Sequence, residues 1–216
     1  MKKKVAFLLS GAAAAFLLCS CFGAYADISI KTDGSGSITL EYRVSQMLES
    51  LGRLDGNERW PAIPVGRADF DRSLAGIPGL RLGSFSSKNT PNKKGGADLV
   101  TRVNLEFNDT GALVTFLDKS GTQTYFSREN GNKLHITLLD PGMAVSDADL
   151  SSLVRDISDG YEIGISLNAP KNAILSTVPT DIKAAKLVSQ GKTVSFSIGL
   201  AELLALNEGL ALEVTW

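Results

Sequence analysis

The chain has 216 residues, 44% of them hydrophobic, and its 22 Lys and Arg against 23 Asp and Glu give a formal charge of −1. Removing a leader that holds Lys2, Lys3 and Lys4 but no acidic residue lowers this charge from −1 to −4. Such a mildly acidic surface excludes nucleic acid as the partner, because affinity for nucleic acid depends on clustered cations that neutralise phosphates.

The first 20 residues are typical of a secretory signal. Three lysines precede an apolar stretch over residues 5–18, which as a helix would span about 21 Å, short of the roughly 30 Å of a bilayer core. We therefore predict a cleaved signal over residues 1–20 rather than a membrane-spanning helix. A short tether over residues 21–26 and a single extracytoplasmic domain over residues 27–216 follow.

The end of the signal offers two cleavage sites. Leu18-Cys19-Ser20-Cys21 resembles the bacterial lipobox, which implies that Cys21 becomes the acylated N-terminus and anchors the protein to a membrane through its acyl groups. Ala24-Tyr25-Ala26 also fits ordinary signal cleavage, and cleavage after Ala26 would give a soluble periplasmic protein. Both cysteines lie in this region, so the domain is expected to contain no disulfide, no thiolate metal site and no cofactor.

The first half of the domain alternates hairpins with short helices. Strict alternation of apolar residues predicts strands over 27–32, 37–44 and 99–107, with a weak one over 80–86, and helical spacing predicts helices over 45–54, 65–77 and 109–119. Asp33-Gly34-Ser35-Gly36 is expected to turn the first hairpin. Polar segments over 55–64 and 86–96 are expected to be loops.

The second half contains two further hairpins. Residues 123–128 and 133–139 flank Asn130-Gly131, and residues 186–190 and 193–198 flank Gly191-Lys192, so tight turns are expected at both. A capped helix is predicted over 147–158, and strands over 161–167 and 210–216. The fold class expected is α+β: a mainly antiparallel sheet built from hairpins, with three to four amphipathic helices packed on one face.

This layout resembles the LppM-type family of bacterial lipoproteins. The likeness rests on short motifs: residues 33–36, the 149–160 helix leading into strand 161–167, Asn168-Ala169-Pro170, residues 191–196 and the terminal 212–216. The resemblance implies an envelope-anchored protein without assigned chemistry that binds lipids or glycolipids. Family members often carry a C-terminal membrane helix, which is not found up to Trp216.

Catalytic motifs are not found. The single histidine, His135, lies between Leu134 and Ile136 on an alternating strand, so we expect it on the opposite, solvent-facing side. No G-x-S-x-G motif supports a serine hydrolase. The acid pairs Asp69 with Asp71 and Asp147 with Asp149 lie near helix starts, where capping explains them better than glycoside hydrolysis. We therefore expect no enzyme.

Two groups of residues are candidates for binding. Lys88, Lys93, Lys94 and Arg102 form a basic patch that could contact anionic head groups beside the anchor, although a solvated loop is the simpler interpretation. A ligand held between helices and sheet would contact an apolar set that an ordinary core also needs: Phe70, Leu74, Leu113, Phe116, Leu117 and Leu153. The function expected is a non-catalytic envelope lipoprotein that binds a lipid, glycolipid or envelope protein. A structural subunit of an envelope complex and a carboxylate-dependent hydrolase of envelope polymers are the alternatives.

Overall fold

The computed structural model describes residues 22–45, 66–92, 95–118, 123–129, 131–140, 152, 155, 156, 158–206 and 208–216. Of these residues, 54% lie in strands and 16% in helices. The described chain is therefore mainly β, with 11 strands in two sheets and 3 short helices. The expected α+β class, with three to four helices covering one face of a sheet, is wrong.

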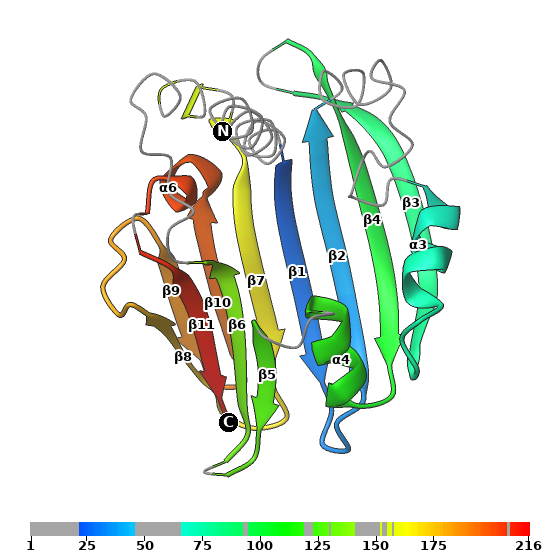
Figure 1. The fold of residues 1–216 in the computed structure, drawn as a ribbon, viewed down its shortest axis with the longest axis vertical. Helices are drawn as coiled ribbons and strands as arrows, with labels where there is room; N and C mark the ends of the chain where they lie inside the picture. The colour runs from blue at the N-terminus through cyan, green and yellow to red at the C-terminus, as the bar shows by residue number, and fades with distance from the viewer. Residues whose placement is uncertain are drawn as a thin grey trace, which may run out of the picture.

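A seven-stranded sheet with the order β3-β4-β2-β1-β7-β10-β9 forms the back of the molecule (Figure 1). Neighbouring strands are antiparallel except β1 and β7, which are parallel. The N-terminal strand is thus the middle strand of the sheet. The strands are β1 (Phe22–Ile30), β2 (Gly36–Ser45), β3 (Leu80–Pro91), β4 (Ala97–Phe107), β7 (Glu162–Asn168), β9 (Lys186–Gln190) and β10 (Thr193–Gly199).

The predicted first hairpin is confirmed as β1 and β2. Ile28 pairs with Ile38 across the hairpin and with Leu167 of β7, and all three side chains are at most 1% exposed. Alternate residues of these strands therefore face a common core, while the residues between them face outward. Strand β1 begins at Phe22, so residues 22–26 belong to the sheet and not to a tether.

The polar segment over residues 86–91, expected to be a loop, is instead the second half of β3. It pairs with β4 through to Pro91 opposite Ala97. The strand keeps its polar side chains because β3 is an edge strand, where charged and polar residues remain in solvent and discourage association with other edges. Residues 86–91 form a strand because they pair with β4, and their own side-chain pattern does not predict a strand.

A second sheet of four antiparallel strands, with the order β5-β6-β11-β8, lies in front of the β7, β10 and β9 part of the large sheet (Figure 1). The predicted hairpin over 123–139 and the last strand are confirmed within it. Gly131 has a positive φ of 103°, as the Asn-Gly turn requires. Strand β8 has no counterpart among the predicted elements. The strands are β5 (Thr124–Ser127), β6 (Lys133–Leu139), β8 (Ile174–Val178) and β11 (Leu210–Thr215).

Three helices complete the cover of the core beside the second sheet (Figure 1). They are α3 (Arg67–Leu74), α4 (Thr110–Leu117) and α6 (Leu200–Leu204). Helix α3 is fixed by Phe70, whose ring lies 6.3 Å from that of Tyr42 and 5.8 Å from that of Phe85. The Asp109 carboxylate caps α4 by accepting from the amide of Ala112 at 2.9 Å. The helices predicted over 65–77 and 109–119 are thus confirmed in shorter form.

Two predicted helices lie largely outside the residues that the structure describes. The helix over 45–54 lies outside the described residues, apart from Ser45 at the end of β2. The helix over 147–158 is described only at residues 152, 155, 156 and 158, which are helical. No helix among the described residues combines the length and apolar character needed to cross a membrane.

We predict that Gly36→Ala destabilises the protein strongly. An added Cβ would lie 1.9 Å from the Ser29 carbonyl oxygen and 2.5 Å from the Phe107 ring, and neither can move without disturbing the central hairpin. The free energy of unfolding, measured by urea denaturation, should fall by about 2–4 kcal/mol.

Gly76→Ala is the matched control, because a Cβ there meets nothing within 4 Å. A Gly36→Ala protein as stable as the Gly76→Ala protein would contradict the register of β1 against β2.

Candidate functional site

The candidate site is a cavity of about 400 Å³ on the outer face of the large sheet, at the end where β1 begins. We call it the tyrosine groove. Its walls come from β1, β2, β7, β10 and the turn before β7, so distant parts of the sequence build it. The lining residues are Gly23, Ala24, Tyr25, Glu41, Arg43, Gly160, Tyr161, Glu162, Gly164 and Ser197.

A glycine allows one tyrosine ring to lie directly on the sheet, and a second ring lies beside another glycine. A Cβ on Gly164 would lie 2.5 Å from Cδ2 of Tyr25, which is too close, whereas one on Gly23 would lie 3.4 Å from Cδ1 of Tyr161, an ordinary contact. Glycine within a strand commonly marks such a close approach. Tyr25 packs over Gly164 and still leaves 45% of its surface exposed. The groove therefore presents aromatic surface to solvent.

A buried carboxylate fixes the second tyrosine. Asp98 is 5% exposed, and its Oδ1 accepts hydrogen bonds from the Tyr161 hydroxyl at 3.0 Å and from Asn92 Nδ2 at 2.8 Å. A charged buried acceptor makes stronger hydrogen bonds than a neutral one. Tyr161 is thus held by both its ring and its hydroxyl, which pre-orders this side of the groove.

A line of alternating charges borders the groove on β2 and β4. Glu41 lies 3.3 Å from the Arg43 guanidinium and accepts from Arg102 Nε at 3.0 Å. Burial alone would raise the pKa of Glu41, but hydrogen bonds from Arg102 and Arg43 outweigh burial, so the pKa lies below its ordinary value. Glu41 is therefore ionised at neutral pH and holds both arginines in place.

This arrangement is suited to binding. The exposed face of Tyr25 offers flat apolar contact, and its hydroxyl, together with the nearby carboxylates and guanidinium, offers hydrogen bonds. The lining residues include neither histidine nor cysteine, so the groove has no pairing of a nucleophile with an imidazole base. A ligand with both hydroxyl groups and apolar faces matches this surface.

No protein-family model matches the chain, and no curated protein matches its sequence. The resemblance to LppM-type lipoproteins therefore stays a prediction that depends on the short motifs quoted above.

The residues predicted for head-group contact divide into two kinds. Lys88 is exposed on β3. It lies at the end of the sheet where β1 begins, as the strand register shows: Phe22 of β1 pairs with Val44 of β2, and the next residue of β2, Ser45, pairs with Asp98 of β4. Asp98 in turn pairs with Thr90 of β3, two residues from Lys88. Arg102 is instead paired with Glu41, which it shares with Arg43. Cys21, Lys93 and Lys94 lie outside the described residues.

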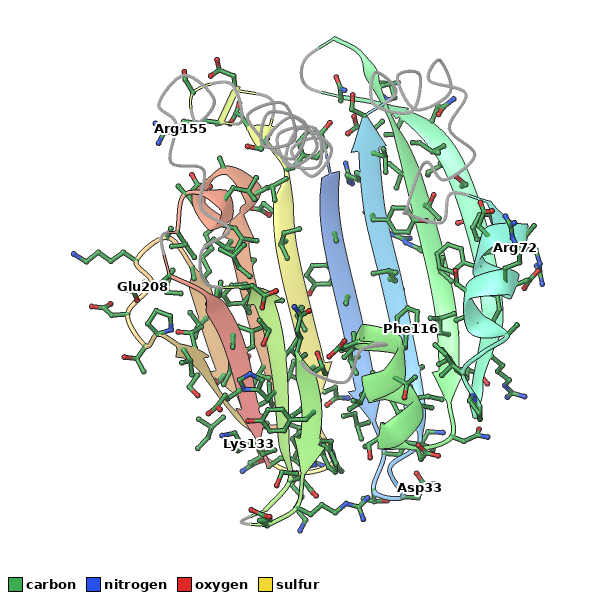
Figure 2. All side chains as sticks on the ribbon, in the orientation of Figure 1. Asp33, Arg72, Phe116, Lys133, Arg155 and Glu208 are labelled. Atoms are coloured by element: carbon green, nitrogen blue, oxygen red, sulfur yellow. The ribbon has the colours of Figure 1, made fainter. Side chains whose placement is uncertain are left out.

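The apolar residues predicted to line a ligand cavity belong to the core. Phe70, Leu74 and Leu113 are at most 7% exposed, and Phe116 and Leu117 pack against the same core. Figure 2 shows Phe116 on α4. Leu153 lies outside the described residues. The tyrosine groove is lined by none of these residues.

The chemistry candidates have structural roles where they are described. Asp69 accepts from the Gly66 amide at 3.0 Å and pairs with Arg72 at 2.5 Å, which confirms capping of α3. Asp147 and Asp149 lie outside the described residues. His135 lies on the strand face opposite buried Leu134 and Ile136, as predicted. Its side chain is only 18% exposed rather than open to solvent, because its ring stacks on Tyr125 at 4.7 Å and its Nδ1 lies 3.3 Å from Glu213.

Sequence reasoning missed the tyrosines of the groove. The sequence pattern places Tyr25 only in a cleavage motif, and Tyr161 only at the start of an alternating strand. The available signal was a glycine two or three residues from a tyrosine in each of two strands, Gly23 with Tyr25 and Tyr161 with Gly164. Only the parallel pairing of β1 with β7 joins these motifs into one groove.

We predict that Glu41→Gln destabilises the protein by about 1 kcal/mol at pH 7, since it leaves two arginines without their shared anion. Because the pKa of Glu41 is lowered on folding from 4.5, this contribution is fully present above about pH 4.5 and disappears as the pH falls through the folded-state pKa. Urea unfolding at pH 7 and pH 3 measures the difference.

Glu106→Gln is the control on the same sheet face. Its pair with Arg81 is far more exposed, with 45% and 77% of the two side chains accessible, so its loss should cost less at pH 7. Equal effects of Glu41→Gln at both pH values would contradict the role assigned to its charge.

Proposed function

We propose that this chain is a bacterial envelope lipoprotein, anchored to a membrane through acyl groups on Cys21, whose β domain binds a lipid or glycolipid head group without catalysis. The observation that carries the proposal is the position of β1. This strand begins at Phe22, the residue after Cys21, and the tyrosine groove begins at Gly23. Two residues span about 7 Å, so an acylated Cys21 would hold the groove against the membrane surface.

The strand also bears on where the signal is cleaved. Cleavage after Ala26 would remove five of the nine residues of β1, from Phe22 to Ala26. These residues pair with β2 from Val44 to Leu40, and three of them also pair with β7. Their loss would leave backbone groups of both neighbouring strands unpaired in the middle of the sheet. An intact sheet therefore favours cleavage before Cys21.

Charge at the same end supports contact with a membrane. Exposed Lys88 lies on the strand that leads into the β3–β4 turn. A lysine near an anionic membrane surface contributes about 1 kcal/mol of attraction. Arg102 is committed to Glu41, so we propose Lys88 for head-group contact and assign Arg102 to positioning of the groove's border.

The alternative role, a structural subunit of an envelope complex, has one observation in its favour. Ile174 and Val178 on β8 and Val188 on β9 are 68%, 49% and 53% exposed. These strands lie together where the two sheets meet, since the Leu175 amide donates to Ser189 Oγ. Exposed apolar residues gathered at one corner are a feature of protein contacts. The hydrolase alternative gains no support from the described acidic residues.

The lipoprotein proposal predicts that Cys21, and not Cys19, is acylated. Labelling with palmitate in the host should mark the wild-type protein and Cys19→Ala but not Cys21→Ala, and globomycin should block processing. The mature mass should correspond to a chain that begins at Cys21. An unlabelled mature protein that begins at Asp27 would overturn the anchor.

The binding proposal predicts that Tyr25→Ala loses a lipid that co-purifies with the wild-type protein. Native mass spectrometry of protein purified from host membranes measures this, after the mature mass has shown that processing is unchanged. Tyr125→Ala is the control, because Tyr125 is also 45% exposed but lies on the small sheet. Equal lipid content in both variants would argue against the tyrosine groove, and a stable protein partner with no lipid would favour the structural role.

A further inference from the structure

A second cavity lies at the opposite end of β1 from the tyrosine groove. It holds about 280 Å³ and forms where the β1–β2 turn, the β5–β6 hairpin and the end of β11 converge. The nine residues of β1 separate the two ends, a distance of about 30 Å at roughly 3.3 Å per residue. Figure 2 labels Asp33 of the β1–β2 turn at this end of the molecule. We call this cavity the Arg128 pocket.

Two cations line the Arg128 pocket without a carboxylate partner of their own. Lys31 and Arg128 both contribute to its wall, and neither makes an ion pair with another described residue. The acid that lines the pocket, Asp33, accepts hydrogen bonds from the Ser35 amide at 2.9 Å and the Ser35 hydroxyl at 2.7 Å. These hydrogen bonds, and the charge of Lys31, lower the pKa of Asp33, which therefore stays ionised. Lys31 and Arg128 together exceed this one carboxylate, so the pocket keeps an excess of positive charge for an incoming anion.

Two aromatic rings stand beside these cations. The Phe126 and Trp216 rings lie 5.7 Å apart and are tilted by 39°, and the Arg128 guanidinium carbon lies 5.6 Å from the centre of the Phe126 ring. Stacking on an aromatic ring orients a guanidinium and leaves its N–H groups free to donate. The side chain of Asn132 adds amide donors and an acceptor at the same wall.

The backbone beneath these side chains is closely tied. The Lys31 amide donates to the Ser35 carbonyl at 2.8 Å, and Gly34 donates back to Lys31 at 3.1 Å. Asn132 and Trp216 exchange two backbone hydrogen bonds of 3.2 and 3.0 Å. Ligand binding would therefore not need to order this backbone further, which favours affinity in a small pocket.

We propose that the Arg128 pocket binds an acidic saccharide, with the sugar carboxylate held by Arg128 and Lys31 and the sugar ring against Phe126 and Trp216. Arg recognises carboxylates through paired N–H donors, and aromatic surface contacts the apolar face of a sugar ring. The volume lies just below the roughly 300–1,000 Å³ of pockets for drug-sized molecules, which suits a single sugar ring. That the Arg128 pocket faces away from the membrane rests on the proposed anchor at Cys21, but binding of the saccharide does not.

Calorimetric titration of the protein, purified from membranes in detergent, tests this proposal with trigalacturonic acid as the probe. Wild-type protein should bind the probe, and affinity should fall about tenfold in Arg128→Gln and about threefold in Lys31→Gln. Both side chains are exposed, so these variants are expected to fold. Lys183→Gln removes the same charge from the exposed β8–β9 connection and should bind as wild type does.

Three comparisons complete the test. The methyl ester of trigalacturonic acid should bind at least tenfold more weakly than the acid, because the carboxylates are then neutral. Inorganic phosphate should not compete at equal concentration, and Cys21→Ala should bind as wild type does, which separates this site from the proposed anchor. Unchanged affinity in Arg128→Gln, equal binding of the ester, competition by phosphate or absence of binding to wild type would each overturn the proposal.

Discussion

The structure depends on the pairing of β1 between β2 and β7. This strand lies in the middle of the large sheet, and Ile28 on it is fully buried. Both edges of β1 are hydrogen-bonded, one to the adjacent strand of its hairpin and the other to a strand more than 130 residues later. The first residues that the structure describes therefore join the two halves of the chain. A change in the start of this strand would affect folding as a whole, because a central strand cannot fray without leaving partners on both sides unpaired.

The pairing of β1 also gives the large sheet two different faces. The inner face buries a continuous apolar core against the small sheet, α3 and α4 (Figure 1). The outer face carries polar residues, such as the cross-strand pairs of Arg102 with Glu41 and Arg81 with Glu106. An antiparallel arrangement tolerates one solvated face. Tyr25 over Gly164 interrupts that polar face with aromatic surface, and the proposed binding role of the groove depends on this interruption more than on any charged residue.

Local pattern was sufficient to predict most hairpins but not the sheets they form. Alternation and turn residues identify β1 with β2, β5 with β6 and β9 with β10, because these pairs are close in sequence. The parallel contact of β1 with β7 is nonlocal and has no local pattern. Strand β3 was missed beyond Ser86 because an edge strand need not bury side chains. Strand β8 was missed because its apolar residues do not follow its burial: polar Thr177 is buried, whereas Ile174 and Val178 are exposed.

The two cavities lie at opposite ends of β1, and the residues that surround each end give them different chemistry. At the end where β1 begins, Gly164 leaves room for the Tyr25 ring, and the Glu41 carboxylate pairs with both Arg43 and Arg102. At the other end, the β1–β2 turn, the β5–β6 hairpin and the end of β11 meet, and the charges of Lys31 and Arg128 exceed that of the one carboxylate, Asp33. Aromatic surface beside paired charges favours hydroxyl-rich head groups, whereas an excess of positive charge beside aromatic rings favours an acidic ligand. One rigid sheet about 30 Å long could therefore hold two chemically distinct ligands at a fixed separation.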